Sequence, residues 1–251
     1  MAVEGKAIDA LGQFELHTAL GAVGKSVGFT QSNLYMLIAA SLIVAMMVWG
    51  MRARAVVPGR MQSLAESAYG FIDDMVLAQI GQEGKRFFPF VFTLFMFILF
   101  GNMLGLFPYA FTYTSHITMT FTMALIVFLL ITTVAIALHG KKFLGYFMPE
   151  GAPMWLAPLI IPVEIVSYLS RPISLSVRLF ANMMAGHVML KVFATFVVMV
   201  GALGAVGPFV AVLPLAINVA LIGFEILVAF LQAYVFAILT CIYLHDAVHL
   251  H

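Results

Sequence analysis

Continuous apolar runs occupy most of the chain, separated by short polar stretches. A run of about 18 or more apolar residues is long enough to cross a bilayer as a helix. Five runs qualify, at about Leu34–Met51, Phe87–Phe107, Ile117–Leu138, Trp155–Val200 and Ala205–Leu244. Membrane strands would instead be only about ten residues long and would alternate polar with apolar positions. The pattern predicts an all-α integral membrane protein with about five transmembrane helices.

The last two runs are too long for ordinary spans. They hold about 46 and 40 residues, which gives helices of roughly 60–70 Å against a hydrocarbon core of ~30 Å. Kinks at Pro158, Pro162 and Pro172 could break the first of them. However, no polar loop interrupts either run, and Gly201–Pro208 is the one clear turn between them. We therefore expect two long, strongly inclined helices that form a hairpin over residues 155–244.

A shorter amphipathic segment lies between the first two runs, at about residues 61–80. Helical spacing places one apolar set on a single face: Met61, Leu64, Ala68, Ile72 and Met75. A polar set lies on another face: Gln62, Glu66 and Asp73. A helix that binds anionic lipid is basic on its polar side. The acidic side chains here favour packing against a partner subunit over lipid binding.

The composition agrees with a membrane protein and excludes a soluble one. Hydrophobic residues make up 63% of the 251 residues and charged residues 9%, against roughly 25% charged residues in soluble domains. The formal net charge of +1 gives no reason to expect a nucleic-acid partner. The single Cys241 excludes an internal disulfide and a thiolate metal cluster.

Basic residues predict the orientation through the positive-inside rule. Five of them gather between the first two runs: Arg52, Arg54, Arg60, Lys85 and Arg86. Lys141 and Lys142 follow the third run. We expect both loops in the cytoplasm, an external N-terminal segment at residues 1–32 without a cleaved signal, and a single membrane domain at 33–251 with a cytoplasmic C-terminus. A bacterial inner membrane is favoured over a mitochondrial one.

Polar side chains recur at seven-residue spacing inside the last two runs. This spacing drifts only ~20° per step on an α-helix, so each set shares one face. The first stripe consists of Glu164, Arg171 and Arg178, with Ser167 and Ser174 between them on the same face and Asn182 four residues further on. The second consists of Asn218, Glu225 and Gln232. Because a charge at bilayer depth costs about 2.5–3.5 kcal/mol on insertion scales, such residues face a partner or a water-filled path.

Arg178 has apolar sequence on both sides and no helix end within reach. Either its charge serves a function, or it forms an internal salt bridge with Glu225 that holds the hairpin together. We favour the functional interpretation, since buried ion pairs contribute little net stability. For Arg171 and Lys191, which lie nearer helix ends, snorkelling is the simpler interpretation.

His187 lies nine residues after Arg178 and about 180° around the helix, so it faces away from the arginine. It is either a hydrogen-bonded packing residue or a proton relay, and we favour the relay because Glu225 is the one carboxylate of the next run. The tail residues His245, Asp246, His249 and His251 have spacing compatible with a metal, but a frayed cytoplasmic tail is the stronger interpretation. No metalloprotease, phosphate-loop or nucleophile-elbow motif occurs. We expect no cofactor, no metal and no bond-making catalysis.

One further motif stands in the second run. Gly101 and Gly105 are four residues apart, which permits a close helix contact, and Pro108 fits the helix end.

The segment Arg171–His187, with sequence RPISLSVRLFANMMAGH, closely resembles the signature of subunit a of F-type ATP synthases. The segments Leu231–Phe236 and Leu239–Leu244 resemble the last helix of that family, and Asn102–Pro108 resembles an earlier motif. With the order of the spans, the resemblance covers nearly the whole chain.

This resemblance implies a stator beside the rotating c-ring, assembled with b-type peripheral stalk subunits and the F1 ATPase. Arg178 then occupies the position of the essential arginine. The path from outside would be lined by His187, Asn218, Glu225 and Gln232. The path to the cytoplasm would pass Glu164, Arg171 and Ser174. Asn182 and Gln232 would flank the arginine.

Many members of the family carry a carboxylate at the position of His187 and an imidazole at that of Glu225. The exchanged pair, as in mitochondrial-like members, leaves open which residue receives the proton first, and favours protons over sodium. Two other classes of function remain as alternatives. A stand-alone ion-coupled transporter would use Arg178 and Glu225 as gates and would often show internal repeats. A structural anchor would use the charges as interhelical contacts only.

Overall fold

The computed structural model of the protein describes residues 29–52, 57–107, 110–140, 143, 145 and 156–249. These residues form six α-helices: α2 (Gln31–Arg52), α3 (Arg60–Gln79), α4 (Phe88–Gly105), α5 (Ile117–His139), α6 (Ala157–Gly201) and α7 (Gly207–Val248). Short 3₁₀ segments connect them: η2 (Gln82–Arg86), η3 (Tyr113–Ser115) and η6 (Gly204–Val206).

The five predicted spans are confirmed. Five helices, all except α3, are long and apolar enough to cross a membrane. Their ends lie within a few residues of the predicted ends, because run length and apolar composition determine them directly. Most of the predicted external segment, and the charges of Arg54, Lys141 and Lys142, lie outside the described residues.

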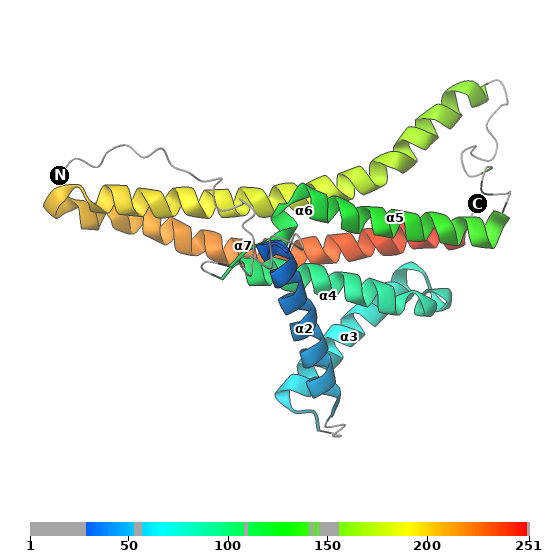
Figure 1. Ribbon diagram of the computed structural model, residues 1–251, viewed down its shortest axis with the longest axis horizontal. Coiled ribbons are helices and arrows are strands. Elements are labelled where there is room, and N and C mark those ends of the chain that lie inside the picture. Colours follow the sequence, from blue (N-terminus) through cyan, green and yellow to red (C-terminus); the bar gives the residue numbers. More distant parts are fainter. Residues whose placement is uncertain are drawn as a thin grey trace.

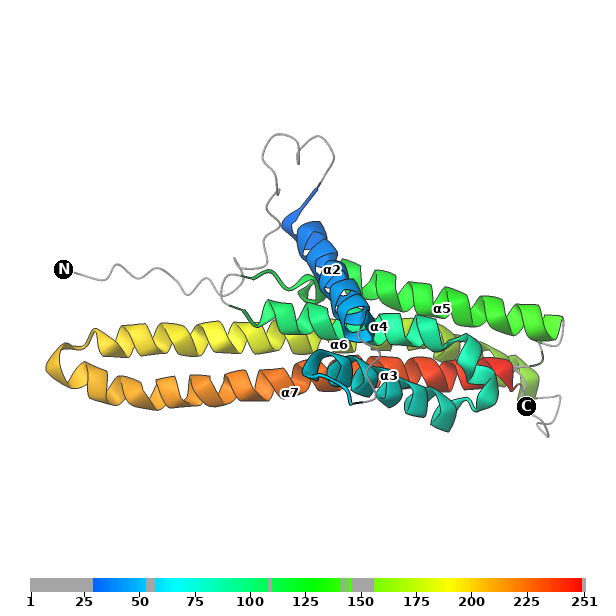
Figure 2. The ribbon, with the colours of Figure 1, turned by 90° about the horizontal axis from the view of Figure 1, so that it is seen from below.

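The long helices α6 and α7 form the expected hairpin. Figures 1 and 2 show α4, α5, α6 and α7 running along the long axis of the molecule, while α2 crosses them steeply. The helices α4 and α5 cover only the half of the hairpin that is remote from the α6–α7 turn. Much of α6 and α7 is therefore free of contact with the other described helices.

The core lies where α4 and α5 pack against α7. Small side chains recur every four residues along α7 and are fully buried there: Ala229, Ala233, Ala237 and Cys241. Because residues four apart share a helix face, this row forms a smooth surface on which α4 can lie closely.

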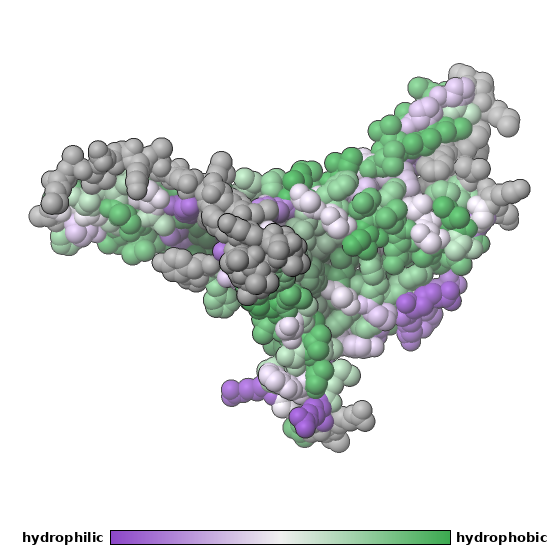
Figure 3. All heavy atoms as spheres, in the orientation of Figure 1, coloured by the Kyte–Doolittle hydropathy of each residue, from purple (hydrophilic) through white to green (hydrophobic). Residues whose placement is uncertain are grey.

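The outer surface is mostly apolar, as Figure 3 shows. The strongly hydrophilic regions of this face include the junctions at the two ends of α3. The exposed residues at these junctions include Arg52, Arg60, Lys85 and Arg86. A broad apolar surface with charges near its margin is the arrangement that a bilayer requires.

Helix α3 forms where predicted, but its buried face is only partly right. Ile72 and Met75 are buried, whereas Met61 and Leu64 are about half exposed. Gln62 is buried instead and donates a hydrogen bond to Glu66 over 2.8 Å. The first turn is rotated because Ala65 packs against Gly50 of α2, where an added Cβ would lie 2.7 Å from the Ala65 Cβ.

Two expectations about the ends of the hairpin are resolved. Helix α6 is continuous through Pro162 and Pro172, and its N-terminal part bends away from the hairpin axis. The frayed tail is wrong: α7 continues to Val248, and His249 N donates to His245 O over 2.8 Å. His251 lies outside the described residues.

Candidate functional site

Arg178 lies on the outer face of α6. Leu175 and Leu179 point into the protein and are almost fully buried, which leaves Arg178 exposed on the other side of the helix. Ser174 and Asn182, the neighbouring members of its stripe, are exposed as well. No hydrogen bond or ion pair joins Arg178 to any described residue. The internal salt bridge with Glu225 is therefore wrong, since Glu225 faces a different group.

The partner of Glu225 is His187. The distance between His187 Nδ1 and Glu225 Oε1 is 3.6 Å, and the side chains are 12% and 4% exposed. The structure thus brings together the imidazole and the carboxylate that the sequence analysis paired as a relay. Both carboxylate oxygens are buried and accept no hydrogen bond from the described residues. A buried carboxylate without hydrogen bonds is stabilised when it is protonated itself or when the neighbouring imidazole is protonated.

Gly186 gives Glu225 the room to reach α6. A Cβ at position 186 would lie 2.8 Å from Glu225 Oε1 and 3.1 Å from Cδ. No real Cβ approaches so closely without displacing its neighbour. The glycine thus keeps the carboxylate beside the α6 backbone and next to His187.

A cavity of about 310 Å³ lies between α6 and α7 beside this pair. Its lining includes four residues that matter for the argument, Asn182, Gly186, Glu225 and Gln232, together with apolar side chains. At ~30 Å³ per water molecule, the space is large enough for several. It leads from the buried carboxylate to Asn182, one turn along α6 from Arg178. Three predicted site residues are therefore neighbours across one cavity.

The remaining uptake residue, Asn218, lies apart from this cavity. It is half-buried on α7, two turns nearer the hairpin turn than Glu225, and its Oδ1 is buried without a hydrogen bond from the described residues. His187 contacts Glu225 but is not among the residues that line the cavity. The four predicted residues do not line a single chamber.

The segment 112–114, between α4 and α5, contributes contacts that the sequence analysis missed. Thr112 Oγ1 lies 2.8 Å from His187 Nε2, and Thr114 Oγ1 donates to Asn102 Oδ1 over 2.7 Å. Tyr113 donates to the Phe97 carbonyl over 2.6 Å. Burial raises the pKa of Tyr113, so its phenol keeps the proton that this bond needs.

The glycine pair of α4 was the available signal for this segment. A Cβ at Gly101 would overlap the Tyr113 ring, and one at Gly105 would overlap the Thr112 side chain. The predicted close contact at these glycines is confirmed, but what fills it is the 112–114 segment. The spacing of the two glycines indicates that another segment can approach α4 closely, but it does not identify that segment.

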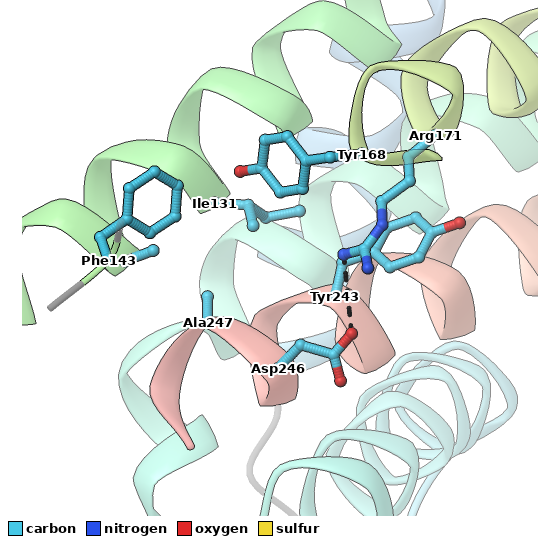
Figure 4. Close-up of a pocket in the computed structure, with 8 residues that line it drawn as sticks. Ile131, Phe143, Tyr168, Arg171, Tyr243, Asp246 and Ala247 are labelled. Atoms are coloured by element: carbon cyan, nitrogen blue, oxygen red, sulfur yellow. Dashed lines mark ion pairs between the residues drawn. The ribbon is translucent and has the colours of Figure 1, made fainter. Parts of the chain in front are cut away.

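Arg171 has a different environment, one heptad before Arg178. Its Nη1 lies 3.6 Å from Asp246 Oδ2, and its guanidinium carbon lies 4.8 Å from the Tyr243 ring centre and 5.3 Å from that of Tyr168. Figure 4 shows the guanidinium against Tyr243 and directed towards Asp246. Tyr168 is in turn within 2.7 Å of the Thr132 hydroxyl of α5.

This group of side chains was only partly predicted. Glu164 lies two turns before Arg171 on the bent arm of α6 and is half-buried. Tyr243 and Asp246 lie eleven and fourteen residues beyond Gln232, the last residue of the predicted α7 stripe. Only the packing of α7 against α6 brings them to Arg171. The cavities around Arg171 hold about 10 Å³ each, so this end of the hairpin is packed closely.

The hairpin presents an exposed cation with no ion pair among the described residues, a buried imidazole–carboxylate pair, and a cavity beside the carboxylate. Such an arrangement can bind and release a proton at the pair and can hold an acidic group of a second molecule at the arginine.

Comparisons with known proteins agree on one family. The profile of the ATP synthase A chain family matches residues 33–245. The ATP synthase subunit a of Granulibacter bethesdensis is 63% identical over 245 residues, which is 97% of this chain and 98% of that protein. The subunit a of Acidiphilium cryptum is equally similar over the same shares, and that of Parvibaculum lavamentivorans is 54% identical over 98% of this chain and 95% of its own length.

Proposed function

Because this chain belongs to the ATP synthase A chain family, we propose that it conducts protons as the Fo stator subunit beside a c-ring. It is a multi-pass membrane protein and a channel component rather than an enzyme by itself. The stand-alone transporter interpretation gives way to this one, since the relatives are subunits of a complex.

The exposed Arg178, which has no ion pair among the described residues, carries the proposal. A cation in an apolar segment needs a counter-charge, and none comes from the described residues of this chain. A ring carboxylate that stops beside it supplies one. At about 4 Å and an effective dielectric near 20, the attraction is worth about 4 kcal/mol. This is enough for an arriving protonated site to release its proton.

Arginine also suits the second part of the task, which is to prevent a leak. A guanidinium stays protonated in proteins, so Arg178 attracts the carboxylate without passing a proton itself. Protons must then take the long route with the turning ring. Each one gains about 2.3 kcal/mol per 100 mV, and the offset of the two half-channels converts this gain into rotation.

The uptake half-channel uses the imidazole–carboxylate pair. A proton from outside passes Asn218, is exchanged between His187 and Glu225, and crosses the cavity towards the ring near Asn182 and Gln232. The 3.6 Å separation of the pair and the cavity of about 310 Å³ support this order.

The release half-channel lies at the other end of the hairpin. It leads past Ser174, Arg171 and Glu164 to the cytoplasmic side. Ser174 is exposed and Glu164 half-buried on α6, whereas Arg171 is held by Asp246. Arg171 would therefore shape this path more than conduct through it.

The orientation follows from the basic loops. With Arg52, Arg60, Lys85 and Arg86 in the cytoplasm, the N-terminus lies outside and the C-terminus inside a bacterial inner membrane. Peripheral stalk b-type subunits and the F1 ATPase complete the assembly, and helix α3 offers them its exposed cytoplasmic face.

Copurification tests this function. The chain is tagged at its C-terminus, extracted gently from its native membrane, and everything retained with it is identified by mass spectrometry. We expect a small proteolipid ring, stalk subunits and soluble ATPase subunits. Recovery of the chain alone, under conditions where other membrane complexes survive, would contradict the proposal.

A further inference from the structure

Asn102 is a polar side chain in the last turn of α4, a helix that is otherwise almost entirely apolar. It is fully buried in α4, where the surrounding residues are nearly all apolar. A buried amide is costly unless it is hydrogen-bonded. Asn102 meets this need on two sides: Oδ1 accepts from Thr114 Oγ1 at 2.7 Å, and Nδ2 donates to the Ala229 carbonyl at 3.1 Å. The proposed proton path uses none of these atoms.

The carbonyl that Asn102 binds lies at an informative point of α7. Ala229 is four residues after Glu225 and three before Gln232, so all three share one side of the helix. Glu225, Ala229 and Gln232 are 4%, 0% and 7% exposed. A hydrogen bond to this carbonyl fixes the rotation of α7 about its axis in the turn that carries both polar side chains.

The 112–114 segment, which contains Thr114, also contacts α6. Thr112, two residues before Thr114, lies 2.8 Å from His187 Nε2 on α6. Residues 112–114 therefore connect to α6 through Thr112 and to α7 through Thr114 and Asn102. His187 is thus held directly, and the helix that carries Glu225 is held through its backbone, by one segment that the Tyr113 bond fastens to α4.

We propose that Asn102, braced by Thr114, is a positioning residue that sets the separation of His187 and Glu225 by fixing the register of α7. This inference rests on the proposed use of that pair in proton uptake. Asn102 touches neither member of the pair. It acts through its hydrogen bond to the Ala229 carbonyl of α7. Residues 112–114 contact α6 through Thr112 and brace Asn102 through Thr114, so they hold the two helices relative to each other.

The test uses the complete complex in lipid vesicles and measures proton uptake from the outer side as a function of outer pH. Two variants break the anchor: Asn102→Leu, which is apolar and of similar volume, and Thr114→Val, which removes only the hydroxyl. Thr114→Ser restores the hydroxyl donor. Thr240→Val is the matched control, because Thr240 is fully buried on α7 and bonds only within its own helix, to the Phe236 carbonyl.

We expect Asn102→Leu to lower the maximal rate about tenfold, since misplacement by ~1 Å can cost up to ~10²-fold. The outer pH at half-maximal rate should shift with it. Thr114→Val should change the maximal rate and the outer pH at half-maximal rate in the same direction but by less. The double variant should have a maximal rate no lower than that of Asn102→Leu. Thr114→Ser and Thr240→Val should keep the original profile.

The pH profile separates positioning from general destabilisation. Among the described residues, α6 presents His187 to Glu225, and the 112–114 segment adds the Thr112 hydroxyl on the far side of the imidazole. Tyr113 of the same segment is turned to Phe97 instead, and burial raises its pKa. A mere loss of folded protein lowers the amount of assembled complex and leaves the profile of the assembled fraction unchanged. That result, or an equal shift in Thr240→Val, would overturn the inference.

A separate variant distinguishes this inference from the function on which it rests. If Glu225→Gln leaves outer-side uptake unchanged, the proposed uptake path itself fails. If Glu225→Gln slows uptake while both anchor variants keep the original rate and profile, the path stands and only the positioning role of Asn102 is lost. If Asn102→Leu does not assemble, the comparison of Thr114→Val with Thr114→Ser decides.

Discussion

Two arginines stand one heptad apart on α6 and have opposite surroundings. Arg171 is 19% exposed, lies against Tyr243, and has Asp246 within 3.6 Å. Arg178 is exposed and has no ion pair among the described residues. Since helix, spacing and residue type are shared, the difference lies in what α7 presents to each position.

This difference indicates where the protein depends on a second molecule. The end of the hairpin at Arg171 is closed by its own side chains, and its cavities hold about 10 Å³. The middle is open, with a cavity of about 310 Å³ beside Glu225. A charge that is satisfied within the chain stabilises the fold, whereas a charge left unsatisfied at bilayer depth requires a partner.

The largest effect is expected at Arg178, and a functional replacement of this residue would remove the contrast with Arg171. We predict that Arg178→Ala abolishes ATP-driven proton pumping, because about 4 kcal/mol of attraction, or roughly a thousandfold, is lost. Arg178→Lys should be nearly as severe, since an amine can give up its proton. Acidification of vesicles by the purified complex measures this. Normal acidification by assembled Arg178→Ala complexes would contradict the account.

The next largest effect is expected at Glu225. Glu225→Gln keeps the shape of the side chain and removes its proton exchange, so uptake from the outer side should slow by roughly 10²-fold with assembly intact. Flux measured while the outer pH is varied tests this. Glu164→Gln, at the opposite end, should instead change the response to cytoplasmic pH. An unchanged rate for Glu225→Gln across the outer pH range would remove it from the path.

A smaller effect tests whether the open middle depends on close geometry. Gly186→Ala places a Cβ 2.8 Å from Glu225 Oε1 and should push the carboxylate from His187, slowing uptake about tenfold. Gly70→Ala is the control, since a Cβ at this helical position in α3 meets nothing within 4 Å. Equal rates in the two variants would show that the position of the carboxylate is not critical.

The smallest effect is expected at the closed end. Asp246 is 37% exposed, so water screens its attraction to Arg171, and Asp246→Asn should cost less than about 1 kcal/mol. We predict a slightly lower thermal stability of the complex, followed by scanning fluorimetry, and retained pumping. Loss of pumping as complete as that of Arg178→Ala would erase the distinction between the two arginines.

Sequence reasoning predicted the features that a helix determines by itself. The five spans were predicted correctly because each membrane helix must satisfy its own backbone and present apolar side chains to lipid. The nine-residue spacing likewise placed His187 on the side of α6 away from Arg178, where Glu225 meets it.

Contacts between distant segments could not be predicted in this way. Periodicity gives the angle of a side chain about its own helix and leaves the neighbouring helix undetermined. The hydrogen bond between Asn102 and the Ala229 carbonyl joins residues that are 127 positions apart in the sequence. Asp246 lies in a segment that the sequence analysis interpreted as a frayed tail. The buried face of the first turn of α3 was predicted wrongly for the same reason, because the contact with Gly50 of α2 decides which side of that turn is buried.

The central claim is that the face of α6 bearing Arg178 meets the ring. Disulfide crosslinking tests it directly, after the buried Cys241 is replaced by alanine. One cysteine is placed beside the ring carboxylate and another on α6, either at Ala181, which is exposed three residues after Arg178, or at Met183, which is fully buried. The account predicts that oxidation links Ala181→Cys to the ring and stops proton pumping, whereas Met183→Cys does not react. Efficient linkage from Met183→Cys, or linkage of Ala181→Cys to another subunit in place of the ring, would contradict it.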